Sequence, residues 1–244
     1  MILAAKTDTG HVRKNNQDSY SLGELTPGTC YAIICDGMGG AAEGQVASGE
    51  CVRIVRERIK SGYYDGMSDI SIRSLLLTAV EYANKYIYRL SVSQEKYEGM
   101  GTTIVAAVLT GEYVYVVHAG DSRAYQLNPK KGEIIQLTRD HSVVQRMIEN
   151  GQITAEEAKD HPEKHLITRA VGVDSEVRTD FCQEDLMPGD IVLLCTDGLT
   201  NYLGIEDLVN LAVDVPLEEY VGKLVEKAND KGGGDNITAV AISV

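Results

Sequence analysis

Five short apolar runs are the feature of this sequence that most constrains its fold. They are rich in β-branched residues and tyrosine, as strands are, and they lie at residues 31–35, 102–109, 113–119, 191–195 and 238–244. Between the first two runs, residues 47–58 and 76–90 carry apolar side chains at helical spacing. A further helix is predicted from about Leu217 to Ala228. Because the helices are grouped rather than alternating with strands, the pattern favours an α+β fold with mainly antiparallel sheets over a doubly wound parallel sheet.

We expect the 244 residues (1–244) to form a single domain, since this length is enough for one full hydrophobic core. One segment, from about 138 to 174, is polar and only weakly periodic. Long segments of this kind often cover a functional site. We therefore predict a flap at 138–174.

The net charge of the chain limits the classes of partner that it can bind. A formal net charge of -13 repels a phosphate backbone, and no basic cluster offsets it, which argues against nucleic-acid binding. No run approaches the roughly 18 apolar residues of a membrane helix, and residues 1–10 do not resemble a signal peptide. We expect a cytoplasmic protein without membrane association.

The five cysteines are odd in number and include no CxxC pair. This argues against both a disulfide framework and a zinc site. We expect them to be small buried hydrophobic residues.

Four aspartates share one local context. Asp36, Asp121 and Asp197 each follow a predicted strand, Asp235 precedes the last one, and each has a glycine beside it. Strand ends fix the backbone, and glycine permits a tight turn or a close approach. Clustered carboxylates repel one another unless a cation neutralises them. Oxygen ligands without histidine or cysteine favour Mg²⁺ or Mn²⁺, so the sequence predicts a magnesium or manganese site.

A nucleotide-binding module is the main alternative from another class. The run 31–35 is followed by Gly37, Gly39 and Ala42, as in a strand-GxGxxA-helix fingerprint, and Glu57 lies about 20 residues on. Asp36 would place a negative charge beside the pyrophosphate. The first helix also leads into a second helix rather than into the parallel strand that a βαβ unit requires.

Seven blocks occur in the order in which a known family has them. They are RKNNQD at 13–18, DGMGG at 36–40, GTT at 101–103, GDSR at 120–123, LTRDHS at 137–142, TDGL at 196–199 and GGGDNIT at 232–238. With these blocks the chain resembles the bacterial branch of the PP2C (PPM) family of metal-dependent serine/threonine phosphatases. The resemblance implies a four-layer α-β-β-α sandwich of two mainly antiparallel sheets flanked by helix pairs. It also implies hydrolysis of phosphoserine and phosphothreonine in proteins by a water that two cations activate, reversing a bacterial serine/threonine kinase.

The same resemblance implies a set of metal ligands. Asp36 bridges two tightly bound ions (Mn²⁺ or Mg²⁺), the main-chain carbonyl of Gly37 adds a ligand, and Asp197 and Asp235 complete the pair. A weaker third ion is implied between Asp121 and Asp197. A pseudophosphatase that only binds phosphoproteins would have lost one of these aspartates, and none is missing.

Two further residues receive roles from the RKNNQD block. Asp18 is expected to orient the metal-bound waters. Arg13 is the expected partner of the substrate phosphate, because a guanidinium offers a fork of two donors and spreads its positive charge over the phosphate oxygens.

The proton donor for the leaving group is where the sequence departs from the family. Many eukaryotic members have histidine at the position of Met38, and many bacterial members have it at the position of Ala41. We expect a metal-bound water to take this role, and His141 and His161 from the predicted flap are the alternatives.

Overall fold

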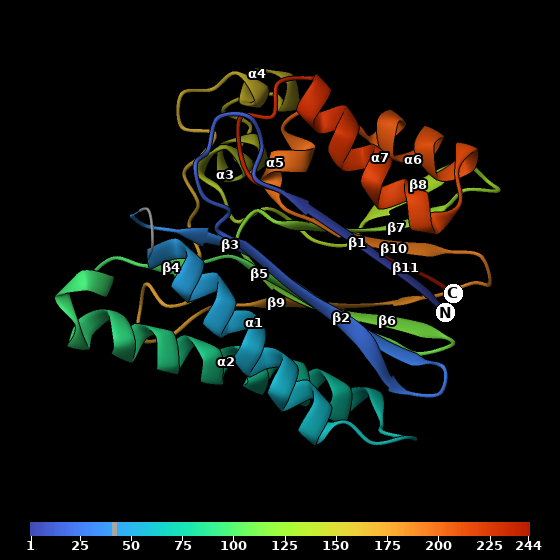
Figure 1. Cartoon of the computed structure of the whole chain (residues 1–244), viewed down its shortest axis with the longest axis horizontal. Coiled ribbons are helices and arrows are strands. Elements are labelled where there is room, and N and C mark those ends of the chain that lie inside the picture. The colour runs from blue at the N-terminus through green and yellow to red at the C-terminus, as the bar shows by residue number, and fades with distance from the viewer. Residues whose placement is uncertain (41–42) are drawn as a thin grey trace.

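The computed structural model describes residues 1–40 and 43–244, and two antiparallel sheets form its centre (Figure 1). The first sheet has the order β1-β11-β10-β7-β8, with strands Ile2–Asp8, Ile237–Ser243, Ile191–Cys195, Arg123–Asn128 and Glu133–Gln136. The second has the order β2-β3-β5-β6-β9, with strands Asp18–Thr26, Thr29–Met38, Ile104–Leu109, Tyr113–Ala119 and Asp180–Asp185; β4 (Gly101–Thr102) also pairs with β3. These sheets confirm the predicted α+β class.

Helix pairs cover the two outer faces of the sandwich. Helices α1 (Glu43–Gly62) and α2 (Asp69–Ser93) pack on the second sheet, and α6 (Ile205–Asp214) and α7 (Leu217–Asp230) pack on the first (Figure 1). The remaining helices are short: η1 (Glu95–Tyr97), α3 (Val143–Glu149), α4 (Ala155–Lys159) and α5 (Asp197–Thr200). The four layers are those that the family resemblance implied.

The apolar sequence of strand β3 follows from the packing of both its faces. Tyr31, Ile33 and Cys35 pack against α1 and α2, whereas Ala32 and Ile34 pack into the core between the sheets. Because alternate side chains of a strand point to opposite faces, a strand covered on both faces has no polar positions. Asp36 then marks where the covered part of the strand ends.

The structure corrects the expected strand at 102–109. It is divided at Thr103 into β4 and β5. Thr103 N–H still donates to the carbonyl of Asp36 at 2.8 Å, but Asp36 N–H donates to the Thr103 hydroxyl at 2.9 Å instead of to the Thr103 main-chain carbonyl. The strands β1, β2, β7, β8 and β9 had not been predicted, because the polar side chains on their more exposed faces interrupt the apolar runs.

The segment 138–174 contains α3 and α4 and is fastened at its base. Val143 N–H donates to the carbonyl of Leu166 at 2.8 Å, and Thr168 N–H donates to that of His141 at 2.7 Å. Figure 1 shows α3 and α4 at one end of the sandwich, near α5. This is the end at which β3, β6 and β10 deliver their aspartates.

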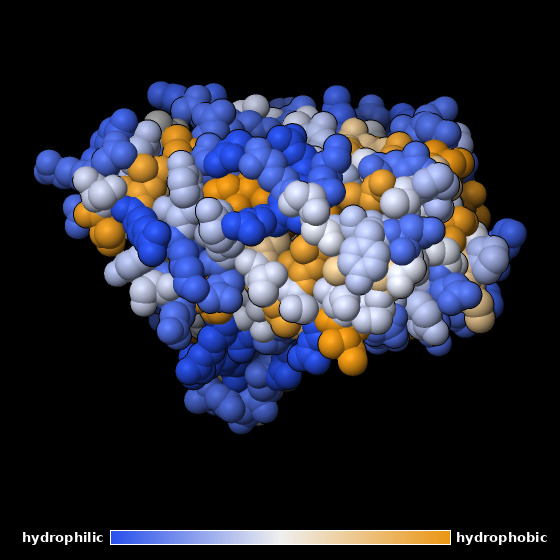
Figure 2. Space-filling view, turned by 90° about the horizontal axis from the view of Figure 1, so that it is seen from below, coloured by the Kyte–Doolittle hydropathy of each residue, from blue (hydrophilic) through white to orange (hydrophobic). Residues whose placement is uncertain are grey.

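The outer surface is mostly hydrophilic on the side seen in Figure 2, where hydrophobic side chains form small separate groups. No helix in residues 1–40 and 43–244 is both long and apolar enough to cross a membrane. The five cysteines, all in the described part of the chain, are free thiols; four are buried, and Cys182 is half-buried.

Candidate metal centre

Four strand ends bring the predicted aspartates to one cavity of about 610 Å³. Asp36 lies near the end of β3, Asp121 follows β6, Asp197 begins α5 directly after β10, and Asp235 precedes β11. The lining also includes Arg13, Gln17, Gly37, Met38, Gly39, Thr103, Lys164, His165, Ile167, Asn201, Tyr202, Gly234 and Asn236. Residues from both sheets and from the segment 138–174 therefore meet here.

Asp18 lies beneath this cavity, directly opposite Asp36 in the β2–β3 ladder. Its Oδ2 accepts hydrogen bonds from the hydroxyls of Thr196 at 2.9 Å and Thr238 at 2.6 Å. Its Oδ1 is buried and has no hydrogen-bond partner among the described residues. A buried acceptor without a partner calls for a donor that the chain does not supply, such as a water held by a cation.

The electrostatic environment of these aspartates favours the binding of a cation. Burial raises the pKa of Asp36 well above its usual value, and the charges of Asp18, Asp197, Asp121 and Asp235 raise it further. Burial also raises the pKa of Asp18 to about 7 and that of Asp121, beside Asp197, to about 8. Like charges held together out of water favour the neutral acids until a cation binds. The donor set is carboxylate and carbonyl oxygen, which suits Mg²⁺ or Mn²⁺.

The GTT block holds the backbone of Asp36 in place. The hydroxyl of Thr102 donates to the Asp36 carbonyl at 2.8 Å, and the Asp36 N–H donates to the hydroxyl of Thr103 at 2.9 Å. The Thr103 hydroxyl also bonds that of Ser122 at 2.7 Å, beside Asp121. The strand break at Thr103 thus connects two of the acidic positions.

Glycine is required after two of the aspartates because backbones approach closely there. A Cβ on Gly37 would lie 2.1 Å from the carbonyl oxygen of Gly44 in α1, and one on Gly198 would lie 2.0 Å from that of Asn236. Any side chain would push α1 or the start of β11 away. The recurring Asp-Gly pairs are therefore needed for packing as well as for turns.

Asn236 fastens the N-terminal loop to the site, a role that sequence reasoning missed. Its Nδ2 donates to the carbonyls of Thr9 at 2.9 Å and Asn15 at 3.0 Å, and its Oδ1 accepts from Gln17 N–H at 2.8 Å. The available signal was its place beside Asp235 in the GGGDNIT block.

Arg13 reaches the cluster through this loop. Its Nη2 lies 2.8 Å from Oδ2 of Asp235, and its side chain is 52% exposed. The hydrogen bond to Asp235 raises the pKa of Arg13, and the charges of Asp36 and Asp197 act in the same direction. The guanidinium is thus held at the rim of the cavity with part of its donor fork open to solvent.

The two histidines that were alternatives to water as the proton donor, His141 and His161, do not line the cavity. His141 is 6% exposed; its Nδ1 accepts from Gly120 N–H at 3.2 Å, and its Nε2 lies 3.2 Å from Asp180. Burial lowers the pKa of His141. The ring of His161 accepts from the N–H of Glu163 at 3.2 Å and does not line the cavity.

A different histidine, His165, lines the cavity, and no sequence pattern had singled it out. Burial raises the pKa of Asp197, and His165 is among the neighbours that lower it. Met38 also lines the cavity, whereas Ala41 lies outside the described residues. Its nearness to Asp197 makes His165 the histidine best placed to serve a leaving group.

Arg123 explains the last residue of the GDSR block. It forms two hydrogen bonds to Asp140, at 2.8 and 2.7 Å, and so joins the start of β7 to the base of the segment 138–174. This bidentate pair is the strong geometry for arginine and carboxylate. GDSR thus supplies one residue to the cavity and one to the framework.

A second group of potential metal ligands lies outside the cavity. His118, His141 and Asp180 each bring a ligand atom within 4.8 Å of the others. The guanidinium of Arg169 already contacts two of them, at 2.9 Å from His141 Nε2 and 2.7 Å from Asp180. The two imidazole rings stack at 4.6 Å. The positive charge of the Arg169 guanidinium already lies against His141 and Asp180, so we assign a structural role to these three potential ligands.

The chain is similar to known proteins along nearly its whole length. A family model described as protein phosphatase 2C matches residues 8–239. Protein phosphatase PhpP of Streptococcus pneumoniae is 36% identical over 246 residues, which cover 100% of this chain and 98% of that protein. The serine/threonine phosphatase of S. agalactiae has a TM-score of 0.92 and 35% identity, covering 100% of this chain and 99% of its own. The catalytic domain of PstP in complex with two manganese ions has a TM-score of 0.84 and 33% identity, covering 100% and 98%.

Proposed function

The chain belongs to the protein phosphatase 2C family, and from this premise we propose that it hydrolyses phosphoserine and phosphothreonine in proteins by in-line attack of water at the aspartate-lined cavity. The observation that carries the proposal is the convergence of Asp18, Asp36, Asp121, Asp197 and Asp235, whose burial and mutual repulsion in the ionised form a bound cation would offset.

The residues that would hold two ions are Asp36, the carbonyl of Gly37, Asp197 and Asp235. Asp121, with Asp197, would hold a weaker third. When bound, such ions lower the pKa of water and neutralise charge on the phosphoryl oxygens. Asp18 contributes from below, because its open Oδ1 can accept a hydrogen bond from a water in the cavity.

The remaining groups act on the substrate. Arg13 presents N–H donors to the phosphoryl oxygens, while its bond to Asp235 keeps the guanidinium turned toward the cavity. Lys164 and His165 come from the segment 138–174, which we propose covers the site as a flap. Expulsion of a serine or threonine oxygen benefits from a proton, and His165 is the histidine that lines the cavity.

The wider setting follows from the proposed activity. We propose that the substrates are phosphorylated by a cognate serine/threonine kinase and that the protein acts in the cytoplasm. A chain of net charge -13 selects substrates through local groups at the cavity rather than through its overall field.

The experiment is a hydrolysis assay with para-nitrophenyl phosphate and a phosphothreonine peptide, with added Mn²⁺ or with excess chelator. Asp36→Asn and Asp235→Asn should each lose nearly all activity while remaining folded by circular dichroism. Asp65→Asn, an exposed aspartate after α1, is the matched control and should retain wild-type activity. Undiminished turnover in chelator would overturn the proposal.

A further inference from the structure

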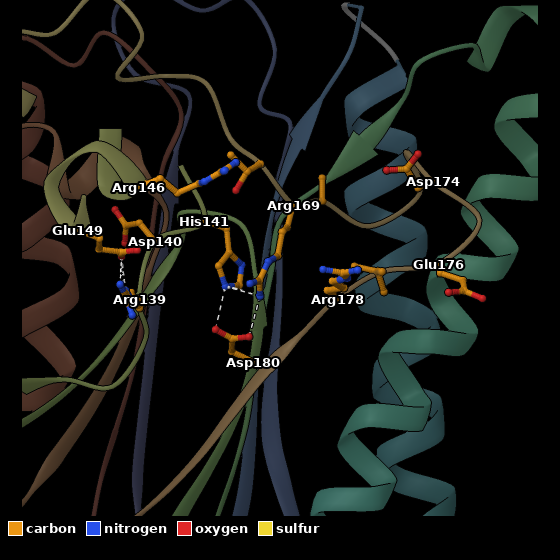
Figure 3. Close-up of a pocket in the computed structure, with 13 residues that line it drawn as sticks. Arg139, Asp140, His141, Arg146, Glu149, Arg169, Asp174, Glu176, Arg178 and Asp180 are labelled. Atoms are coloured by element: carbon orange, nitrogen blue, oxygen red, sulfur yellow. Dashed lines mark hydrogen bonds and ion pairs between the residues drawn. The ribbon is translucent and has the colours of Figure 1, made fainter. Parts of the chain in front are cut away.

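A second cavity, of about 540 Å³, lies outside the metal centre and contains four of the eleven arginines of the chain. It lies between the segment 138–174 and the approach to β9 (Figure 3). Its lining residues are Arg139, Asp140, His141, Arg146, Glu149, Thr168, Arg169, Ala170, Asp174, Glu176, Val177, Arg178 and Asp180. We call it the arginine pocket.

Three of its carboxylates are already paired. Arg139 pairs with Glu149, and Arg169 lies 2.7 Å from Asp180. Asp140 is held by Arg123, which comes from outside the pocket. These pairs account for three of the five carboxylates in the lining; the other two are Asp174 and Glu176.

Two arginines remain without such a partner. Neither Arg146 nor Arg178 forms an ion pair with any residue in the described ranges 1–40 and 43–244, although both are on the pocket wall. In Figure 3 they reach toward Arg169 from opposite sides, while Glu176 lies farther away, beside α2. Two unpaired guanidinium groups around a third make a receptor for a tetrahedral dianion, since each offers a fork of N–H donors.

The arginine pocket shares a wall with the metal cavity. Within one stretch of chain, Lys164, His165 and Ile167 line the metal cavity, and residues 168–170 line the arginine pocket. A substrate strand that follows this stretch would pass from one cavity to the other.

We propose that the arginine pocket binds a second phosphoryl group of the same protein segment, on a residue close in sequence to the one being hydrolysed. The proposal rests on the proposed function and adds a preference for multiply phosphorylated segments. Arg146 and Arg178 are the recognition residues, and Arg169 is held between them by Asp180 and His141.

The test compares two peptides that each contain one hydrolysable phosphothreonine. In one peptide a residue four positions away is unmodified; in the other it is a non-hydrolysable phosphonate analogue of phosphoserine. The wild-type protein with Mn²⁺ should show a kcat/KM about tenfold higher for the second peptide, the scale expected of charge-assisted hydrogen bonds on a partly exposed surface. Equal values would overturn the proposal.

Substitutions test whether Arg146 and Arg178 cause the preference for the second peptide. Arg146→Ala combined with Arg178→Ala should abolish it, leaving kcat/KM for the singly modified peptide and for para-nitrophenyl phosphate within about twofold of wild type. Arg89→Ala, an exposed arginine on α2, is the control for loss of an arginine elsewhere on the surface and should keep the preference. If the preference survives the double substitution, another surface reads the second phosphate and the proposal is wrong.

Two further arms separate related explanations. If the double variant changes only inhibition by inorganic phosphate, and not the preference between peptides, the pocket holds a free ion and the proposal fails. If the wild type hydrolyses neither peptide with Mn²⁺, the proposed function fails first. Hydrolysis of both peptides at equal rates would reject the arginine pocket alone.

Discussion

The buried carboxylates predict how stability responds to pH when no metal is bound. Burial raises the pKa of Asp18 to about 7, against 3.8 in an unfolded chain. Between these values the folded state holds a proton that the unfolded state has released, so the free energy of unfolding falls as pH rises. The proton retained by Asp18 alone lowers it by about 1.4 kcal/mol per pH unit, which gives about 2 to 3 kcal/mol from pH 5 to pH 7. For a chain of this length that corresponds to about 5 to 10 °C in Tm. Asp121, whose pKa burial raises to about 8, adds to this loss in the same direction.

A bound cation should remove this loss, because it binds the ionised carboxylates and stabilises the folded state. The buried His118 and His141 act in the opposite direction. Burial lowers both pKa values, so these residues add stability as pH rises toward 6.5. Their contribution is the same with and without metal and cancels when the two conditions are compared.

The assay is thermal unfolding followed by circular dichroism at pH 5, 6 and 7, with saturating Mn²⁺ or with chelator. The gap in Tm between the two conditions should widen by at least about 5 °C from pH 5 to pH 7, the scale expected from Asp18 alone. Asp18→Asn should reduce the widening, and Asp65→Asn should leave it unchanged. Carboxylates with ordinary pKa values are ionised throughout this range, so a constant gap would refute the argument.

Three predictions concern catalysis. Arg13→Ala should raise KM and lower kcat with metal binding intact, and Arg13→Lys should recover only part of the loss because an ammonium lacks the fork; an unchanged kcat/KM would contradict the role. Asp121→Ala should leave two ions bound by calorimetry yet lower phosphopeptide turnover, whereas loss of the tight sites would place Asp121 among their ligands. His165→Ala should lower phosphopeptide turnover at least about tenfold more than para-nitrophenyl phosphate turnover, since only the serine or threonine oxygen needs a proton to leave. His141→Ala should not, and an unchanged ratio in His165→Ala would return that role to water.

The sequence by itself predicted which aspartates line the candidate metal centre. An aspartate beside glycine at a strand end is a local pattern, and the four aspartates that were predicted from it as metal ligands line one cavity. The apolar runs of β3 and β10 could be recognised in the sequence because both faces of each strand are covered, which makes the side chains of these runs apolar. Strands such as β1 and β2 have partly exposed polar positions, and their apolar pattern is too weak to read alone.

Only the tertiary structure decided which partners meet across long separations in sequence. Asp18 accepts a hydrogen bond from the hydroxyl of Thr238, which is 220 residues away in the sequence. Asn236 donates hydrogen bonds to a loop near the other end of the chain. The tertiary structure also decided which histidine lies at the cavity. His141 and His165 lie in one polar segment with no periodicity to orient them, and the fold turns the first inward against Asp180 and the second toward the aspartates. Local sequence fixes which groups a strand end can present, but the packing of two sheets and a long connecting segment fixes which of them face one another.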